Sequence, residues 1–141
     1  MGTSSLRSGM IMVLIDTSAW IEALRVDGDS GIRQRVAALL KAGQVVLCDM
    51  VILELWNGAR GERERAELRS IIDVLTKVPI SRGVWSRASS LAVQCRAIGV
   101  TVPATDLLIA ATARFHGIDL LESDRHFRMI PDEDLSSELS S

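Results

Sequence analysis

The chain of 141 residues lacks several features that would narrow its class. No apolar run approaches the ~20 residues needed to cross a bilayer. Residues 1–9 carry one charge and no apolar core, so they are not expected to act as a signal peptide. Of the two cysteines, Cys48 and Cys95, neither lies in a CxxC pair or close to a histidine. We therefore expect buried free thiols in a reducing compartment, which predicts a cytoplasmic protein.

Lysine is equally scarce, because Lys41 and Lys77 are two of the 16 basic residues and the other fourteen are Arg. The net charge of −2 provides no overall basic footprint of the kind expected for a nucleic-acid-binding protein. Arginine suits phosphate groups, but a GC-rich genome also favours it. Residues 60–69 concentrate four Arg and three Glu. Their i,i+4 pairs indicate a solvated helix face, with a phosphate-contacting stripe as the alternative.

Short apolar runs alternate with segments whose apolar residues recur at helical spacing. Proline at position 79 places the third apolar run at a sheet edge, because proline cannot donate to a strand ladder. This alternation predicts an α/β fold with a parallel sheet of about four strands. The strands are expected at residues 10–15, 45–48, 78–80 and 118–121.

One domain is expected, at residues 10–130, because no internal repeat divides the chain and its length suffices to bury one core. Residues 1–9 are interpreted as an extension or tag, with a natural start at Met10 or Met12. Residues 131–141 form an acidic, serine-rich tail. We expect both ends to be mobile.

The segment from position 103 to 124 contains the most apolar helix in the chain. Thr105 is the expected N-cap, and Gly117 lies where a left-handed residue ends a helix. A helix that is apolar nearly all round is expected to be buried. Two carboxylates nevertheless bracket this segment, because Asp106 opens the helix and Asp124 follows the last strand.

Two more acids join Asp106 and Asp124 as candidate site residues. Asp16 directly follows the first strand, and Glu54 lies off the apolar stripe of a helix. In parallel sheets the functional crevice lies beyond the carboxyl ends of the strands, where Asp16, Asp106 and Asp124 are expected. Each acid also has an ordinary explanation: an N-cap for Asp16, a helix-dipole contact for Asp106, solvation for Glu54 and a turn for Asp124.

Carboxylates gathered at the edge of a core repel one another, and their pKa values rise. A divalent cation relieves that repulsion, and Mg²⁺ or Mn²⁺ prefers hard oxygen ligands and keeps several waters. Such an ion orients an attacking water and stabilises charge developing on a phosphate. The two histidines are not expected to be catalytic: His116 is interpreted as a cation at a helix end, and His126 as a surface residue.

The residues at 13–20, Glu54, the block at 103–113 and the Asp-Arg-His-Phe at 124–127 resemble the PIN domain. Within that family the chain is similar to VapC-type toxins of bacterial toxin–antitoxin pairs, over residues 10–130. The resemblance implies a three-layer α/β/α fold with a central, mainly parallel sheet of about four to five strands. It also implies an Mg²⁺- or Mn²⁺-dependent endoribonuclease that acts on RNA, forms a homodimer and is silenced by a cognate antitoxin.

Carried over by motif, Asp16, Asp106 and Asp124 are the implied metal ligands, and Glu54 completes the set of four catalytic acids. The resemblance gives supporting roles to hydroxyls near the pocket. These are the hydroxyls of Thr17, Ser18 and Ser123.

One departure from the family pattern lies close to the last acid. Family members often have Thr or Ser two positions before that acid, where this chain has Glu122. Either Ser123 supplies the missing hydroxyl, or Glu122 adds a fifth carboxylate.

Other functions fit part of the pattern. A housekeeping RNA-processing nuclease would use the same acids. A receiver-like signalling module also gathers acids above a parallel sheet, but it requires a Lys after a late strand, which neither Lys41 nor Lys77 provides. A haloacid dehalogenase-type phosphatase requires a second Asp where Ser18 lies. A non-catalytic RNA-binding domain would not require the acids at all.

Overall fold

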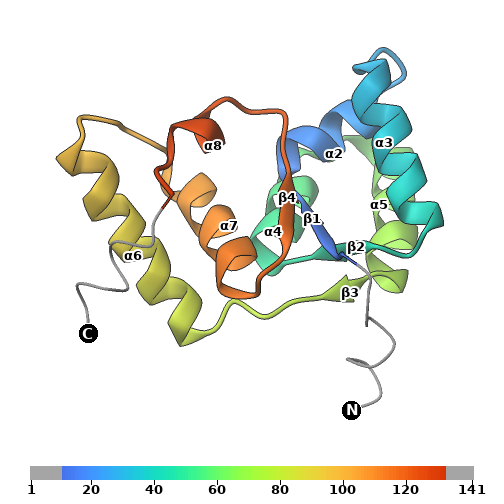
Figure 1. The fold of residues 1–141 in the computed structure, drawn as a ribbon. Helices are drawn as coiled ribbons and strands as arrows, with labels where there is room; N and C mark the ends of the chain where they lie inside the picture. The colour runs from blue at the N-terminus through green and yellow to red at the C-terminus, as the bar shows by residue number, and fades with distance from the viewer. Residues whose placement is uncertain (1–10, 133–141) are drawn as a thin grey trace.

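The computed structural model describes residues 11–132, so the expected extension at residues 1–9 and most of the expected tail at 131–141 lie outside the described residues. The described part of the chain folds into strands and helices that alternate for most of its length (Figure 1). In chain order these elements are β1 (Val13–Ile15), α2 (Thr17–Leu24), α3 (Ser30–Lys41), β2 (Val45–Leu47), α4 (Asp49–Gly58), α5 (Gly61–Val74), β3 (Thr76–Lys77), α6 (Arg82–Ala97), α7 (Ala104–Phe115), β4 (Asp119–Leu121) and α8 (His126–Met129).

The four strands form one sheet in the order β3-β2-β1-β4, and every neighbouring pair is parallel. The three residues of β1 and the three of β2 are all buried, as expected for strands covered on both faces. The predicted α/β class with a parallel sheet is therefore confirmed.

Helices lie on both sides of the strands: α6, α7 and α8 on one side, and α2, α3 and α5 on the other (Figure 1). The fully buried side chains of Trp20 in α2 and Leu91 in α6 belong to one continuous core. Between α6 and α7, a Cβ added at Gly83 would lie 2.5 Å from the Phe115 ring, so a larger residue there requires this exposed ring to move. No helix in residues 11–132 combines the length and apolar character needed to span a membrane.

The most apolar helix, α7, is buried over its central part, as predicted, with seven consecutive buried residues from Leu107 to Ala113. The prediction of Thr105 as its N-cap was wrong. The helix begins at Ala104, because Pro103 has φ −56° and its carbonyl accepts the Leu107 amide at 3.0 Å. Gly117 ends the helix with φ 65°, in the left-handed conformation that was expected.

The third strand also differs from the prediction. It occupies Thr76–Lys77 rather than residues 78–80, and it pairs with Val46 and Leu47 of β2. The Val78 amide still donates to the Leu47 carbonyl at 2.8 Å, but Pro79 has no amide proton to continue the ladder. The expected edge position is confirmed, since β3 is the outermost strand beside β2.

The pairing of β1 with β4 determines where the predicted acids lie. Ile15 is in register with Leu121 of β4, and the Asp16 amide donates to the Leu121 carbonyl at 3.0 Å. The residues that follow these two strands therefore emerge side by side at the carboxyl edge of the sheet, where a crevice is expected.

Candidate active site

Asp16 is both the N-cap of α2 and a buried carboxylate, with only 2% of its surface exposed. Its oxygens accept the backbone amides of Ser18 and Ala19, each at 3.2 Å, and the Ser18 hydroxyl at 2.8 Å. Burial raises the pKa of Asp16, the bonds from Ser18 and Ala19 oppose that shift, and the Glu122 carboxylate adds to it. The N-cap role considered from the sequence is therefore confirmed, and the same carboxylate lies buried directly after β1.

The Ser18 hydroxyl links two strand ends. It donates to Asp16 and accepts the backbone amide of Ser123 at 3.1 Å, although these serines are 105 positions apart. The contact from Ser123 uses its amide, and the Ser123 residue is exposed. Ser18 thus fixes the loop after β4 against the first turn of α2.

Asp106 lies in the first turn of α7 with 13% of its side chain exposed. Its buried Oδ2 atom accepts no hydrogen bond from the described residues. The pKa of Asp106 is raised to about 6, first by burial and then by the Asp124 carboxylate; Asp16 and Glu54 also raise it, while His126 lowers it. Of the four predicted acids, the structure brings Asp106 and Asp124 together beside His126, whereas Asp16 and Glu54 reach Asp106 through their electrostatic influence.

Asp124 is held by contacts within its own turn. Its Oδ1 atom accepts the backbone amide of His126 at 2.9 Å, which is the main reason why the pKa of Asp124 lies below its ordinary value. Contacts with the His126 side chain lower that pKa further. Neighbouring Asp106 and Asp124 therefore have pKa values shifted in opposite directions.

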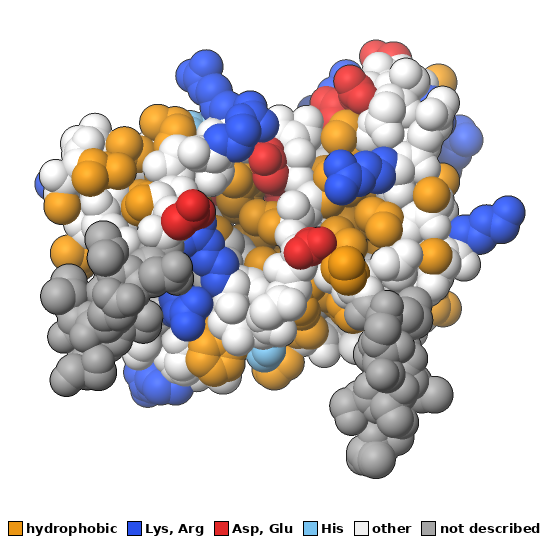
Figure 2. Space-filling model, in the orientation of Figure 1, with side chains coloured by type: hydrophobic (Ala, Val, Ile, Leu, Met, Phe, Trp, Pro, Cys, Tyr) orange, Lys and Arg blue, Asp and Glu red, His pale blue; other side chains and the backbone are white. Residues whose placement is uncertain are grey.

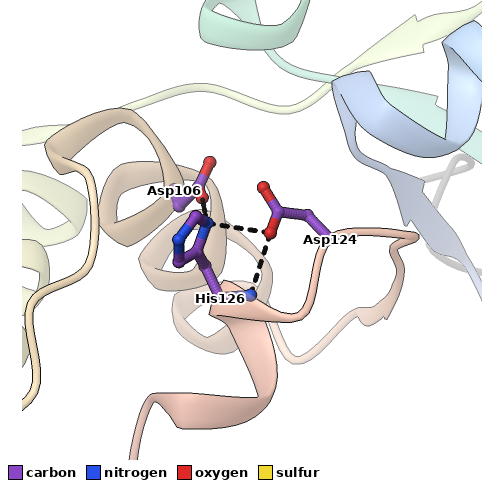
Figure 3. Close-up of side chains that lie close together, drawn as sticks. All are labelled: Asp106, Asp124 and His126. Atoms are coloured by element: carbon purple, nitrogen blue, oxygen red, sulfur yellow. Dashed lines mark hydrogen bonds and ion pairs between the residues drawn. The ribbon is translucent and has the colours of Figure 1, made fainter.

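His126 belongs to the site, so its interpretation as a surface residue was wrong. Its Nδ1 atom lies 2.8 Å from Asp124 Oδ1 and 3.5 Å from Asp106 Oδ2 (Figure 3). Only 36% of its side chain is exposed. The sequence did indicate that His126 lies near Asp124, because a histidine two positions after a turn-forming Asp belongs to the same turn. It did not show that α7, which carries Asp106, packs beside that turn.

Glu54 reaches the site from α4 and is half-buried. The Thr17 hydroxyl donates a short hydrogen bond to its Oε1 atom. Thr17 is the first residue of α2, directly after Asp16, so its hydroxyl contacts a predicted acid as expected.

Glu122 lies beside the same pocket with 17% of its side chain exposed. Its carboxylate acts on Asp16, and its Oε2 atom lies 3.4 Å from Nη1 of Arg128. Its other oxygen is buried and has no hydrogen-bond partner among the described residues. Glu122 therefore lies near enough to Asp16 to raise the pKa of that buried carboxyl group.

The residues present fit a divalent cation. Ligand atoms of Asp106, Asp124 and His126 all lie within 4.8 Å of one another. The buried Oδ2 atom of Asp106 lacks a hydrogen-bond partner among the described residues, and the neighbouring carboxylates repel it. A bound cation would pair with that oxygen and relieve the repulsion. In the view of Figure 2, an acidic side chain lies in the upper middle of the molecule, and Lys or Arg side chains lie above it and to its right.

A groove of about 1190 Å³ reaches the site at Glu54 and passes between α2 and the α4–α5 pair. Its apolar lining comes from both sides, and its rim carries charges of both signs. The lining residues are Ile21, Leu24, Arg25, Val26, Asp27, Arg33, Glu54, Leu55, Gly58, Ala59, Arg60, Arg63, Glu64, Glu67 and Leu68.

Comparisons with known proteins agree with this geometry. The family model for the PIN domain matches residues 13–133. The chain is 30% identical over 122 residues to VapC ribonuclease Mb1587 of Mycobacterium bovis, and the match covers 84% of this chain and 91% of that protein.

Two solved structures share the fold. VapBC from Salmonella typhimurium, bound to DNA, has a TM-score of 0.73 and 21% identity, with 86% of this chain and 94% of that chain covered. A toxin-antitoxin complex from Klebsiella pneumoniae has a TM-score of 0.65 and 20% identity, covering 80% of this chain and 87% of that chain. At these identities the likeness concerns the fold alone.

Proposed function

Because the chain belongs to the PIN-domain family and to its VapC ribonucleases, we propose that it is a metal-dependent endoribonuclease and the toxin of a toxin–antitoxin pair. The observation that carries this proposal is the cluster of Asp106, Asp124 and His126, together with the electrostatic influence of Asp16 and Glu54 on Asp106. The nuclease domain on this account comprises residues 10–130.

Asp16, Asp106 and Asp124 are the proposed ligands of Mg²⁺ or Mn²⁺. When bound, such an ion supplies orientation for an attacking water and stabilises charge developing on the phosphate. The buried Oδ2 atom of Asp106 supports this assignment, because it faces His126 Nδ1 at 3.5 Å but accepts no hydrogen bond from the described residues and is therefore available to a cation.

The other residues of the site orient the attacking water and hold the acidic side chains in position. Thr17 occupies one oxygen of Glu54, which leaves the second oxygen to accept a hydrogen bond from the water that approaches the phosphodiester. Ser18 holds Asp16 and the loop that bears Asp124 in one arrangement, since its hydroxyl contacts both segments. Such fixed positioning is what phosphoryl chemistry requires from side chains that form no covalent bond.

The groove is the proposed binding site of a cognate antitoxin. Its lining from Ile21, Leu24 and Leu55 suits the apolar face of an amphipathic helix, the mode of recognition in which a helix fills a groove. Because the groove reaches Glu54, a basic side chain beyond that helix would enter the acidic pocket and pair with its carboxylates. We also expect a homodimer, which sedimentation analysis measures.

The test is cleavage of total cellular RNA by the purified protein. We expect cleavage with Mg²⁺ or Mn²⁺, loss of cleavage in EDTA, and recovery when either ion is added in excess. Cleavage that continues unchanged in EDTA would reject the metal-dependent mechanism.

A further inference from the structure

His126 is the one nitrogen donor at the acidic site among the described residues. Its Nδ1 atom faces two carboxylate oxygens at once, at 2.8 Å from Asp124 and 3.5 Å from Asp106 (Figure 3). Adjacent ligands of a six-coordinate ion at about 2.1 Å lie roughly 3 Å apart. The two distances therefore correspond closely to neighbouring positions around one cation.

The local fold holds this nitrogen in place. Asp124 Oδ1 accepts the backbone amide of His126 at 2.9 Å, so the carboxylate and the imidazole are fixed by the same turn. Helix α8 begins at His126 and is anchored by the buried side chain of Phe127, with buried Ile130 following its last turn. The imidazole thus approaches Asp106 without ordering a free loop, which reduces the entropic cost of coordination.

We propose that His126 is a direct ligand of the metal and shifts the preference of the site from Mg²⁺ towards Mn²⁺, an inference that rests on the proposed nuclease function. Mg²⁺ dehydrates reluctantly and prefers oxygen donors in a strict octahedron. Imidazole nitrogen binds ions of the transition series more readily, and affinity rises across that series from Mn²⁺ onwards. A ligand set that adds one imidazole to the proposed carboxylates therefore discriminates against Mg²⁺ more than an all-carboxylate set does.

The competing role for His126 is indirect. An imidazole that only donates to Asp124 would orient that carboxylate without touching the ion. Both roles predict weaker metal binding when His126 is removed, so affinity alone does not distinguish them. A signal from nitrogen bound directly to the ion does.

The chain contains two histidines, which makes that signal assignable. Mn²⁺ is added to the purified protein, and modulation of its electron spin echo by a directly bound imidazole nitrogen is recorded. We expect the modulation in the wild type and its loss in His126→Ala. The matched control is His116→Ala, because His116 Nε2 contacts the Pro79 carbonyl at 2.8 Å instead, and this variant should keep the signal.

Affinity measurements complete the test. Mn²⁺ binding should weaken about 10- to 100-fold in His126→Ala, with a smaller loss for Mg²⁺. His126→Asp, which restores an oxygen donor, should narrow the difference in affinity between Mn²⁺ and Mg²⁺.

The outcomes separate this inference from the proposed function. Wild-type protein that binds Mn²⁺ without imidazole modulation would overturn the inference and leave the nuclease proposal standing. Protein that binds neither ion would overturn both. The wild-type spectrum decides the question even if a His126 variant fails to fold.

Discussion

The Thr17 hydroxyl donates a hydrogen bond to Glu54 Oε1, although the two residues are 37 positions apart. This bond joins the first turn of α2 to the middle of α4 at the point where both helices border the acidic crevice. Because this bond holds one oxygen of the Glu54 carboxylate, the direction of its second oxygen is fixed as well.

The bond predicts the effect of Thr17→Val, which keeps the shape of the side chain and removes its hydroxyl. We expect RNA cleavage to slow by about 10- to 100-fold, because a hydrogen bond to a charged group contributes on the order of 1.5–3 kcal/mol. Thr17→Ser is the control and should retain most activity. Equal rates for Thr17→Val and the wild type would show that the orientation of Glu54 does not limit cleavage.

The raised pKa of Asp106 predicts a pH dependence of stability in metal-free protein. Between the ordinary value of 3.8 and the folded value of about 6, the folded protein retains a proton that the unfolded chain releases. The free energy of unfolding contributed by this group is therefore full below pH 3.8 and is lost as pH rises through about 6.

Asp106→Asn removes that loss. In EDTA at neutral pH we expect the variant to be more stable than the wild type by about 1–2 kcal/mol, and the gap to close towards acid pH. Urea unfolding at a series of pH values measures the difference. Asp119→Asn, at an exposed position of β4, is the control that should leave the pH profile unchanged. A wild type as stable as Asp106→Asn at neutral pH would contradict the buried, repelled carboxylate.

Much of this arrangement could be predicted from the sequence. A buried apolar run that ends directly in Asp16 predicted both the strand and the position of its acid, because strand ends and helix caps are local features. The long apolar stretch of α7 predicted a buried helix for the same reason.

The rest depended on contacts between distant segments. The pairing of Ile15 with Leu121, which brings the loops after β1 and β4 together, is a property of the strand order. His126 was missed because its proximity to Asp106 requires α7 to pack beside the turn that follows β4. The expected cap at Thr105 failed because the backbone of Pro103 started the helix earlier.

The position of the groove predicts which substitution weakens the binding of an antitoxin. Ile21 lines it with 45% of its surface exposed, so Ile21→Glu places a charge where an apolar helix face would pack. We expect affinity for the protein encoded beside this gene to fall about tenfold or more, and RNA cleavage to persist in its presence. Val93→Glu changes an exposed residue of α6 outside the groove lining and should remain inhibited. Unchanged affinity in Ile21→Glu would place the partner elsewhere.

The most direct test of the account is the rate of RNA cleavage by Asp106→Asn in saturating Mn²⁺, compared with the wild type and with Asp119→Asn. The substitution preserves the shape of the side chain and removes a charge that interacts with three other acids and with His126. The account predicts a loss of about 100-fold or more for Asp106→Asn, because metal-assisted stabilisation of the transition state is worth several kcal/mol, and a near wild-type rate for Asp119→Asn. Cleavage by Asp106→Asn at the wild-type rate would contradict it.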